Sequence, residues 1–221
     1  VKDGDNIYTT IDSKLQTLLE TKVSQVNAKV SPKSMTATLM NAKTGAILAT
    51  TQRPTFNAQT KTGLSKMWRN LLVEDTYEPG STMKVFTMAA AIDSGKYNAN
   101  VTVPTGEYKI GNNTVPDWNT SGWGNITYAK GFALSSNTAM AHLEQAMGAK
   151  TWLKYIKRFG LRESTNSGLD NEQSGSIQFT YPIEQADTAF GQGIQVTAMQ
   201  MLRGFTAIAN HGKMLQPYFI S

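Results

Sequence analysis

The stretch Tyr77-Glu78-Pro79-Gly80-Ser81-Thr82-Met83-Lys84 decides how this sequence of 221 residues is interpreted. Pro79-Gly80 interrupts the chain, and an apolar run begins directly after Ser81. The spacing of the apolar residues predicts a helix over residues 82–94, and Gly95 is the residue expected to end it. Val85, Met88, Ala89 and Ile92 should share one face. Because almost every inner position is Ala, Met, Val or Phe, this helix should be buried on most sides.

Ser81 and Lys84 form the single Ser-x-x-Lys pattern of the sequence. Residues three apart lie on one face of a helix, so the hydroxyl and the amine should be neighbours. An amine within an apolar helix loses solvation, which favours its neutral form, and a neutral amine can take the proton of a hydroxyl. Free N–H groups at the helix start favour a developing negative charge. The alternative is a capping serine followed by a surface lysine.

The sequence before this helix predicts another helix and a β-hairpin. Asp12 or Ser13 can cap the first helix, and Ser31-Pro32 should end it. Gly45 suits the turn of the hairpin. The expected elements are a helix over residues 11–30, strands over residues 35–40 and 46–51, and a loop with short helical pieces over residues 52–78. The apolar face of the first helix should comprise Leu15, Leu18, Leu19, Val23 and Val26.

The sequence after residue 95 predicts loops, helices and a returning strand. A hairpin could turn at Gly111-Asn112-Asn113 within the first loop. The expected elements are an extended loop over residues 96–125, helices over 128–134, 137–147, 151–159 and 197–210, a loop or small hairpin over 161–181, and the start of a strand over 214–221. Together these elements predict an α+β fold or an α/β sandwich.

The composition excludes several classes of site. The absence of cysteine rules out a disulfide framework, a thiolate nucleophile and a cysteine zinc site. Neither His142 nor His211 has metal-ligand partners in the sequence, so both should be structural or solvated. The net charge of +5 includes a mild basic cluster at residues 150–158, which predicts a solvated helix face. No basic stripe alternates with aromatic residues, so nucleic acid is not expected as a partner.

The sequence gives no sign of a membrane span or a signal peptide. No apolar run approaches the length of about 18 residues that a span needs. Val1 opens a polar stretch, and the numbering starts without methionine. We therefore expect this sequence to be a piece of a longer chain.

A second pattern, Ser-x-Asn, occurs twice, at Ser135-Ser136-Asn137 and at Ser164-Thr165-Asn166. The first lies between two expected helices, where packing would hold a hydroxyl and an amide for proton relay and substrate binding. The second lies in a polar loop, and we interpret it as accidental. The alternative for Ser135 and Asn137 is a helix cap.

A third pattern, Lys-[Ser/Thr]-Gly, occurs together with Ser-x-x-Lys and Ser-x-Asn in enzymes that form an acyl-enzyme on a serine, and would complete that set here. It occurs at Lys43-Thr44-Gly45, in the expected hairpin turn, and at Lys61-Thr62-Gly63, in the expected loop. We reject both because they precede Ser81, whereas the third motif should lie on a strand after the second. No match follows Asn137, so we expect the C-terminal part of the domain to be missing from this chain.

Further stretches extend these two motifs over essentially the whole chain. They are residues 35–39, 42–45, 47–56, Phe190-Gly191-Gln192-Gly193 and residues 205–210. In this order they resemble the transpeptidase domain of class B penicillin-binding proteins, most closely the Gram-positive type called penicillin-binding protein 2x. The resemblance implies an α+β fold like that of serine β-lactamases and penicillin-binding proteins. Its antiparallel sheet is flanked by helices, and the C-terminal strands would be missing here.

The resemblance also implies roles for five residues. Ser81 would be the acylated nucleophile and Lys84 its proton acceptor, while Ser135 would relay the proton to the leaving amine. Asn137 would bind the substrate's amide, and Trp118 would line the cleft. The oxyanion would be held by the Ser81 N–H and by an N–H from the absent third motif. No metal or other cofactor is implied.

The implied protein is an extracytoplasmic enzyme at the bacterial cell membrane, held by an N-terminal anchor absent from this sequence. It would cross-link peptidoglycan stem peptides through a serine acyl-enzyme, take part in cell division, and be inhibited covalently by β-lactams. Residues 1–221 would be a partial domain that ends before Lys-[Ser/Thr]-Gly and acylates poorly alone. Its partners would be divisome membrane proteins and the C-terminal remainder of the domain, which could be a separate chain.

Two alternatives belong to other classes of protein. A serine β-lactamase would share the acylation residues, but we find no glutamate placed to activate water. A catalytically inactive penicillin-binding sensor or scaffold would keep the fold without the chemistry. The joint presence of Ser81, Lys84, Ser135 and Asn137 argues against it.

Overall fold

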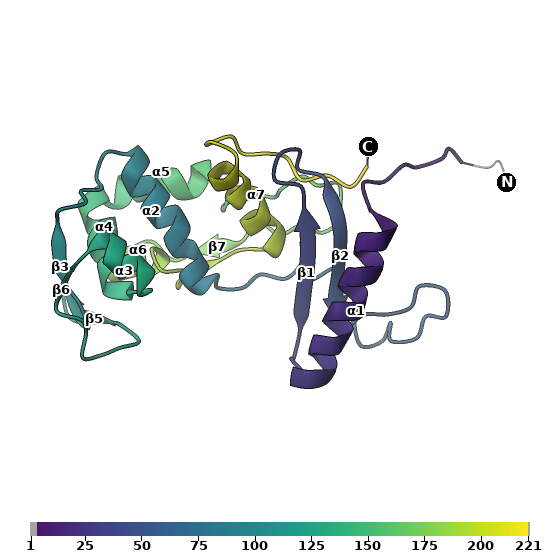
Figure 1. Ribbon diagram of the computed structural model, residues 1–221, viewed down its shortest axis with the longest axis horizontal. Coiled ribbons are helices and arrows are strands. Elements are labelled where there is room, and N and C mark those ends of the chain that lie inside the picture. The colour runs from purple at the N-terminus through teal and green to yellow at the C-terminus, as the bar shows by residue number, and fades with distance from the viewer. Residues whose placement is uncertain (1–3, 221) are drawn as a thin grey trace. The chain divides into compact units, whose positions relative to one another are not determined.

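The structure is a computed structural model that describes residues 4–220 (Figure 1). Its helices and antiparallel strand pairs give an α+β fold. The described residues form two compact units. The first comprises the residues up to Thr76, residues 164–174 and the residues from Thr197 onward, and the second comprises residues 77–163 and 175–196.

The first unit is built on a hairpin and two helices. Its elements are α1 (Ser13–Val30), β1 (Met35–Met40), β2 (Ile47–Arg53) and α7 (Ala198–Ala209). The register of the hairpin aligns Thr38 with Thr50, whose hydroxyl oxygens are 2.8 Å apart. Gly45 has a φ of 86° in the turn, and a Cβ there would collide with the backbone of Gln216. Only glycine suits this position.

Local signals in the sequence correctly predicted the limits of these helices. Asp12 caps α1 by accepting hydrogen bonds from two N–H groups of the first turn. Ser31 ends α1 in the left-handed conformation. Thr197 and Gln200 form a capping box at the start of α7. These limits are predictable because each cap involves residues that are close in sequence.

The predicted apolar face of α1 was wrong in part. Val23 is buried, but the exposed fractions of Leu18 and Val26 are 53% and 47%. The stripe that meets the hairpin runs through positions 15, 19 and 23, which are spaced four apart along the helix. Leu18 and Val26 lie to one side of this stripe, and polar residues occupy its other side.

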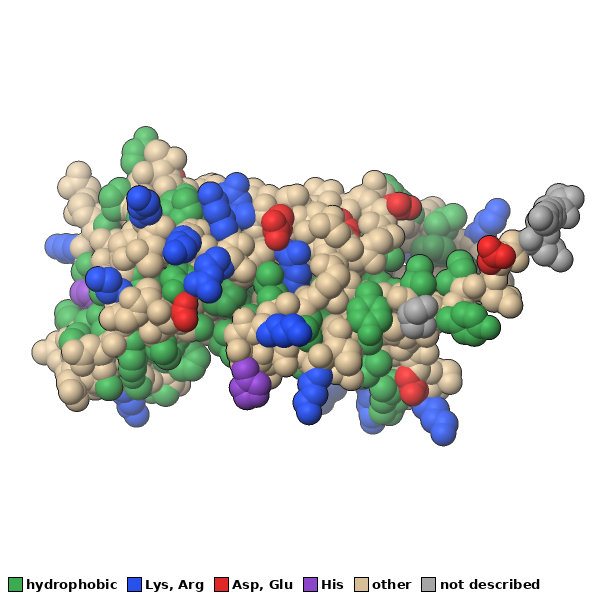
Figure 2. Space-filling view, turned by 90° about the horizontal axis from the view of Figure 1, so that it is seen from above, with side chains coloured by type: hydrophobic (Ala, Val, Ile, Leu, Met, Phe, Trp, Pro, Cys, Tyr) green, Lys and Arg blue, Asp and Glu red, His purple; other side chains and the backbone are tan. Residues whose placement is uncertain are grey.

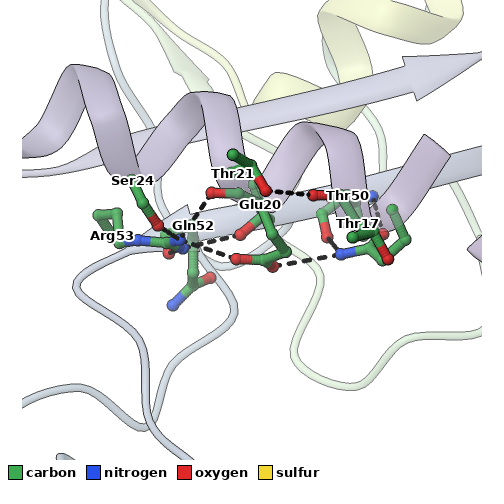
Figure 3. A network of polar contacts seen from close by, with 9 residues as sticks. Thr17, Glu20, Thr21, Ser24, Thr50, Gln52 and Arg53 are labelled. Atoms are coloured by element: carbon green, nitrogen blue, oxygen red, sulfur yellow. Dashed lines mark hydrogen bonds and ion pairs between the residues drawn. The ribbon is translucent and has the colours of Figure 1, made fainter. Parts of the chain in front are cut away.

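Polar contacts fasten α1 to β2 in place of a wider apolar face (Figure 3). The amide of Gln16 donates to the Thr50 carbonyl at 2.8 Å and accepts from the Thr50 N–H at 2.9 Å. The Arg53 guanidinium pairs with Glu20 at 2.7 Å and donates to Ser24 at 2.8 Å. Although burial opposes ionisation of Glu20, its hydrogen bonds and the Arg53 charge keep its pKa below the usual value.

The loops of the first unit differ from the prediction in two respects. Residues 54–76 contain turns but no helical piece. The final residues form isolated bridges rather than a strand: Tyr218 bridges to Ala46, and Ile220 bridges to Thr9. A small core holds the unit together, formed by Ile47, Leu72, Val73 and Met199.

The second unit is mainly helical. In chain order its elements are the 3-10 turn η1 (Gly80–Met83), α2 (Lys84–Asp93), β3 (Thr102–Pro104), β4 (Glu107–Ile110), β5 (Asn113–Pro116), β6 (Asn125–Thr127), α3 (Tyr128–Ala133), α4 (Asn137–Met147), α5 (Ala149–Arg158), β7 (Ser176–Ile177), α6 (Pro182–Thr188) and β8 (Ile194–Gln195). The predicted hairpin at Gly111 is confirmed as β4–β5. One core cluster is formed by Ile110, Val115, Ala141, Ala186 and Phe190.

Several details of this unit differ from the prediction, including the antiparallel pair of β3 and β6, since β3 lies in the stretch that was predicted as an extended loop. The buried face of α2 includes Phe86 and Ala90, whereas Ile92 is 58% exposed. Lys84 is also buried, so the side of the helix that carries Lys84 faces inward and Ile92 faces solvent. α6 lies in a stretch, residues 182–188, for which the sequence analysis predicted no helix or strand. β7 pairs with β8 rather than with a neighbour inside residues 161–181, so no local hairpin forms there.

The basic cluster lies on the exposed face of α5, as predicted. Lys150, Lys154, Lys157 and Arg158 are exposed, while Trp152 and Ile156 on the opposite face are buried. Figure 2 shows Lys and Arg side chains gathered on the surface in this part of the molecule. Among residues 4–220, no helix is long and apolar enough to cross a membrane.

Candidate active site

Ser81 lies in η1, one turn ahead of α2, and a glycine-containing loop supports this turn. Gly80 donates its N–H to the Gly191 carbonyl at 3.1 Å. Gly193 donates its N–H to Glu78 Oε1 at 2.8 Å. A Cβ at Gly191, where φ is 84°, would collide with the Gly80 backbone. The loop over residues 190–193 therefore fixes the backbone just before Ser81, which gives Phe190-Gly191-Gln192-Gly193 a structural role.

We expect Gly191→Ala to lower the free energy of unfolding by about 2–4 kcal/mol, because it adds a backbone collision to the strain of a positive φ. The matched control is Gly95→Ala, where φ is 70° and nothing lies within 4 Å of an added Cβ. This control should cost only about 1 kcal/mol. Denaturant unfolding measures both. Equal losses would show that the contact with Gly80 is unimportant.

The Lys84 side chain is only 2% exposed, although it begins α2. Its ammonium donates to the Ser135 carbonyl at 2.6 Å, to Ser135 Oγ at 3.1 Å and to Asn137 Oδ1 at 2.7 Å. Three acceptors match the three protons of a charged lysine. The predicted alternative of a surface lysine is therefore wrong.

Burial lowers the pKa of Lys84 to about 8, although the negative charge of Asp117 acts in the opposite direction. With this pKa, about a tenth of the lysine is neutral at pH 7. The pKa of this amine is therefore close to neutral pH, which suits a general base.

The first Ser-x-Asn motif forms the turn between α3 and α4. Ser136, the middle residue, caps α4 by accepting the Ala139 N–H, so the cap involves neither Ser135 nor Asn137. Ser135 has a φ of 55°, and its hydroxyl donates to Ser81 Oγ at 3.0 Å. Lys84 thus reaches Ser81 through Ser135, in a continuous chain of hydrogen bonds.

Asp117 is a site residue that the sequence analysis missed. It is 3% exposed and lies just after β5. Its carboxylate accepts from the N–H groups of Asn137 (2.5 Å), Thr138 (3.1 Å) and Gly106 (2.9 Å). It also accepts from the hydroxyls of Thr138 (2.8 Å) and Ser136 (3.1 Å). Burial opposes ionisation, but these hydrogen bonds outweigh it and keep the pKa of Asp117 below its usual value.

Trp118 lies beside this group with an exposed indole. Its side chain is 72% exposed, and its Nε1–H donates to the Leu134 carbonyl at 3.0 Å. Its ring meets Trp123 edge to face, with the ring centres 5.4 Å apart. The indole is therefore fixed next to the Ser135 turn while one face remains available to a ligand.

The five predicted site residues all belong to the second unit. The other Ser-x-Asn match belongs to the first unit, where Ser164 and Thr165 donate to Glu172 at 2.7 and 2.9 Å. The two early Lys-Thr-Gly matches also lie in the first unit. The geometry thus separates the first Ser-x-Asn motif from the matches that were rejected.

The family model for the penicillin-binding protein transpeptidase domain matches residues 35–221, which is most of the chain. The chain belongs to this family. It is 45% identical to penicillin-binding protein 2X from Streptococcus thermophilus, with a TM-score of 0.93, over 99% of this chain and 33% of that one. The predicted family and fold class are confirmed.

Curated relatives of this transpeptidase family agree. Stage V sporulation protein D of Bacillus subtilis is 36% identical over 98% of the chain and 35% of its own length. Peptidoglycan D,D-transpeptidase FtsI of Escherichia coli is 31% identical over 94% of the chain and 36% of its own length. The chain therefore spans about a third of the length of these relatives.

Proposed function

We propose that this chain carries the acylation residues of a peptidoglycan D,D-transpeptidase. The observation that supports this most strongly is the hydrogen-bond chain from Lys84 through Ser135 to Ser81. A buried amine with a pKa of about 8 is thereby connected to a hydroxyl that can act as a nucleophile. The family membership and the similarity to FtsI, a peptidoglycan D,D-transpeptidase, support the same reaction class.

The first half-reaction begins when Lys84 is neutral. Its free electron pair accepts the Ser135 proton, and Ser135 Oγ takes the proton of Ser81, so the hydrogen bond between the two serines reverses. Ser81 Oγ then bonds to the carbonyl carbon between two D-alanines of a stem peptide. When the C–N bond breaks, the Lys84 proton passes back through Ser135 to the leaving amine, and D-alanine departs. Asn137 would hold the substrate's amide, and Trp118 would line the cleft.

The second half-reaction joins the acyl group to another strand. An amine of a neighbouring stem peptide attacks the acyl carbon, and the amine's proton passes through Ser135 to Ser81 Oγ as the ester C–O bond breaks. The new amide bond is the cross-link, and the two half-reactions give ping-pong kinetics. A β-lactam enters at the first step, but its leaving group stays tethered to the acyl group. The covalent complex should therefore be long-lived, and β-lactams should act as covalent inhibitors.

We further propose that residues 1–221 are the N-terminal part of the transpeptidase domain. A Lys-[Ser/Thr]-Gly strand and the second oxyanion donor would come from the C-terminal remainder, in the same chain or in a separate one. The share of each relative that the chain covers supports this proposal. We place the protein at the outer face of the bacterial cell membrane, with an N-terminal anchor and divisome membrane proteins as partners.

The lifetime of the penicilloyl adduct tests this function against a β-lactamase. Intact mass is followed after a pulse of penicillin on the full-length protein that contains this chain. A transpeptidase should retain one adduct for many minutes. Turnover within seconds would favour the β-lactamase, and the absence of any adduct would favour an inactive scaffold.

The acylation rate should rise with pH through about 8, because only the neutral form of Lys84 can accept a proton. Two pH units below this pKa, the second-order rate constant for penicillin should be about a hundredfold below its plateau. Stopped-flow acylation between pH 5.5 and 9.5 measures the profile. A flat profile over this range would contradict the assignment of Lys84 as the base.

A further inference from the structure

We propose that Asp117 is a positioning residue for acylation, which holds the Ser135–Asn137 turn in place and supplies the negative charge that balances the Lys84 ammonium. This inference rests on the proposed function and extends it to a residue that touches neither the nucleophile nor the base through a hydrogen bond. Its support comes from contacts of the second unit alone.

The carboxylate of Asp117 is fully occupied. Oδ1 accepts the N–H groups of Asn137 and Thr138, which are two of the free donors at the start of α4. Oδ2 accepts the Gly106 N–H and two hydroxyls. A buried carboxylate with five donors is held in one place, and it holds the start of α4 in return.

The segment that carries Asp117 meets the turn at two further points. The Asn137 amide donates to the Pro116 carbonyl at 3.1 Å. The Trp118 indole donates to the Leu134 carbonyl at 3.0 Å. Residues on both sides of Ser135 are therefore hydrogen-bonded to residues 116–118. Because Ser135 is in the left-handed conformation, which a serine adopts at a cost, these ties help to keep its hydroxyl next to Ser81.

Asp117 is also the charged group that acts on Lys84 among the described residues. The titratable groups that follow Lys84 in α2 and Asn137 in α4 lie more than one helical turn along these helices. Along α4, His142 and Glu144 follow Asn137 by five and seven residues, about 7 and 10 Å along the axis. Asp93 lies at the opposite end of α2, about 13 Å along the axis from Lys84. Removal of the Asp117 charge should therefore make Lys84 easier to deprotonate.

Two substitutions in the full-length protein separate the charge of Asp117 from its geometry. Asp117→Asn removes the charge and several acceptor contacts. In the pH profile of acylation, the rise on the acid side (the acid limb) should shift to lower pH by about one unit. The rate constant at high pH (the plateau) should fall at least about tenfold. Asp117→Glu keeps the charge but displaces the carboxylate, so the limb should stay in place while the plateau falls. The control Asp93→Asn, which removes an equal charge at the far end of α2, should change neither quantity.

A purely structural role would lower the plateau without moving the limb, so an Asp117→Asn profile with the wild-type limb would overturn this inference. If Asp117→Asn fails to fold, the substitution Thr138→Val tests the positioning role of Asp117 instead. It removes one hydroxyl donor and leaves the charge, so the plateau should fall several-fold with the limb in place. An unchanged plateau in Thr138→Val would also overturn the inference. Wild-type acylation at Ser81 is measured in parallel, and its absence would instead remove the proposed function.

Discussion

Ser81→Ala should abolish covalent labelling of the full-length protein by a fluorescent penicillin. Ser81 Oγ is the hydroxyl at the far end of the hydrogen-bond chain from Lys84 through Ser135, so this change removes the oxygen that should bond to the acyl group. We expect the labelling rate to fall by at least about 10⁴-fold, the scale on which a lost nucleophile acts. The change removes one oxygen from an exposed side chain, so the melting temperature should hardly change.

Ser164→Ala is the matched control, because Ser164 belongs to the other Ser-x-Asn match and binds Glu172 instead. It should label at the wild-type rate. If Ser81→Ala still formed an adduct while Ser164→Ala did not, the nucleophile would lie in the first unit, and our interpretation of the motifs would be wrong.

Lys84→Met should reduce the acylation rate by about 10²–10⁴-fold, the usual contribution of a general base. Methionine fills a similar volume, and the 2% exposed site no longer has to hold a charge. The three acceptors of Lys84 lose their donor, which offsets this gain, so the free energy of unfolding should stay about the same. Stopped-flow acylation and denaturant unfolding measure the two quantities on one sample.

Lys96→Met is the control for this substitution, because Lys96 lies just beyond α2 and is exposed. It should leave both acylation and stability unchanged. The combination expected for Lys84→Met, lost activity with retained stability, separates a chemical role from a structural one. A parallel loss of stability and acylation would show that the lysine mainly supports the fold.

Much of this site could be predicted from the sequence because its motifs are local. Ser81 and Lys84 are three residues apart, and the hydroxyl and amide of the Ser135 motif lie in one turn. Helix ends were predictable for the same reason: Asp12 and Thr197 act on N–H groups within three residues.

Contacts between distant segments could not be predicted in this way. Asp117 meets the start of α4 only after twenty residues of chain fold back, and a single aspartate in a polar stretch carries no periodic signal. The exposure of Ile92 on α2, which was expected to be buried on most sides, could not be predicted for a related reason. Lys84 faces inward because Ser135 and Asn137 supply acceptors for it, and these acceptors are visible only in the fold.

The location of the penicillin adduct on the protein is the sharpest test of the roles proposed for Ser81, Lys84 and Ser135. The labelled full-length protein is digested with trypsin, which should release residues 70–84 as one peptide, and the peptides are sequenced by mass spectrometry. We predict a single penicilloyl group on the oxygen of Ser81. An adduct on Ser135, on Ser164 or on any other residue would contradict the proposal that Lys84, acting through Ser135, activates Ser81.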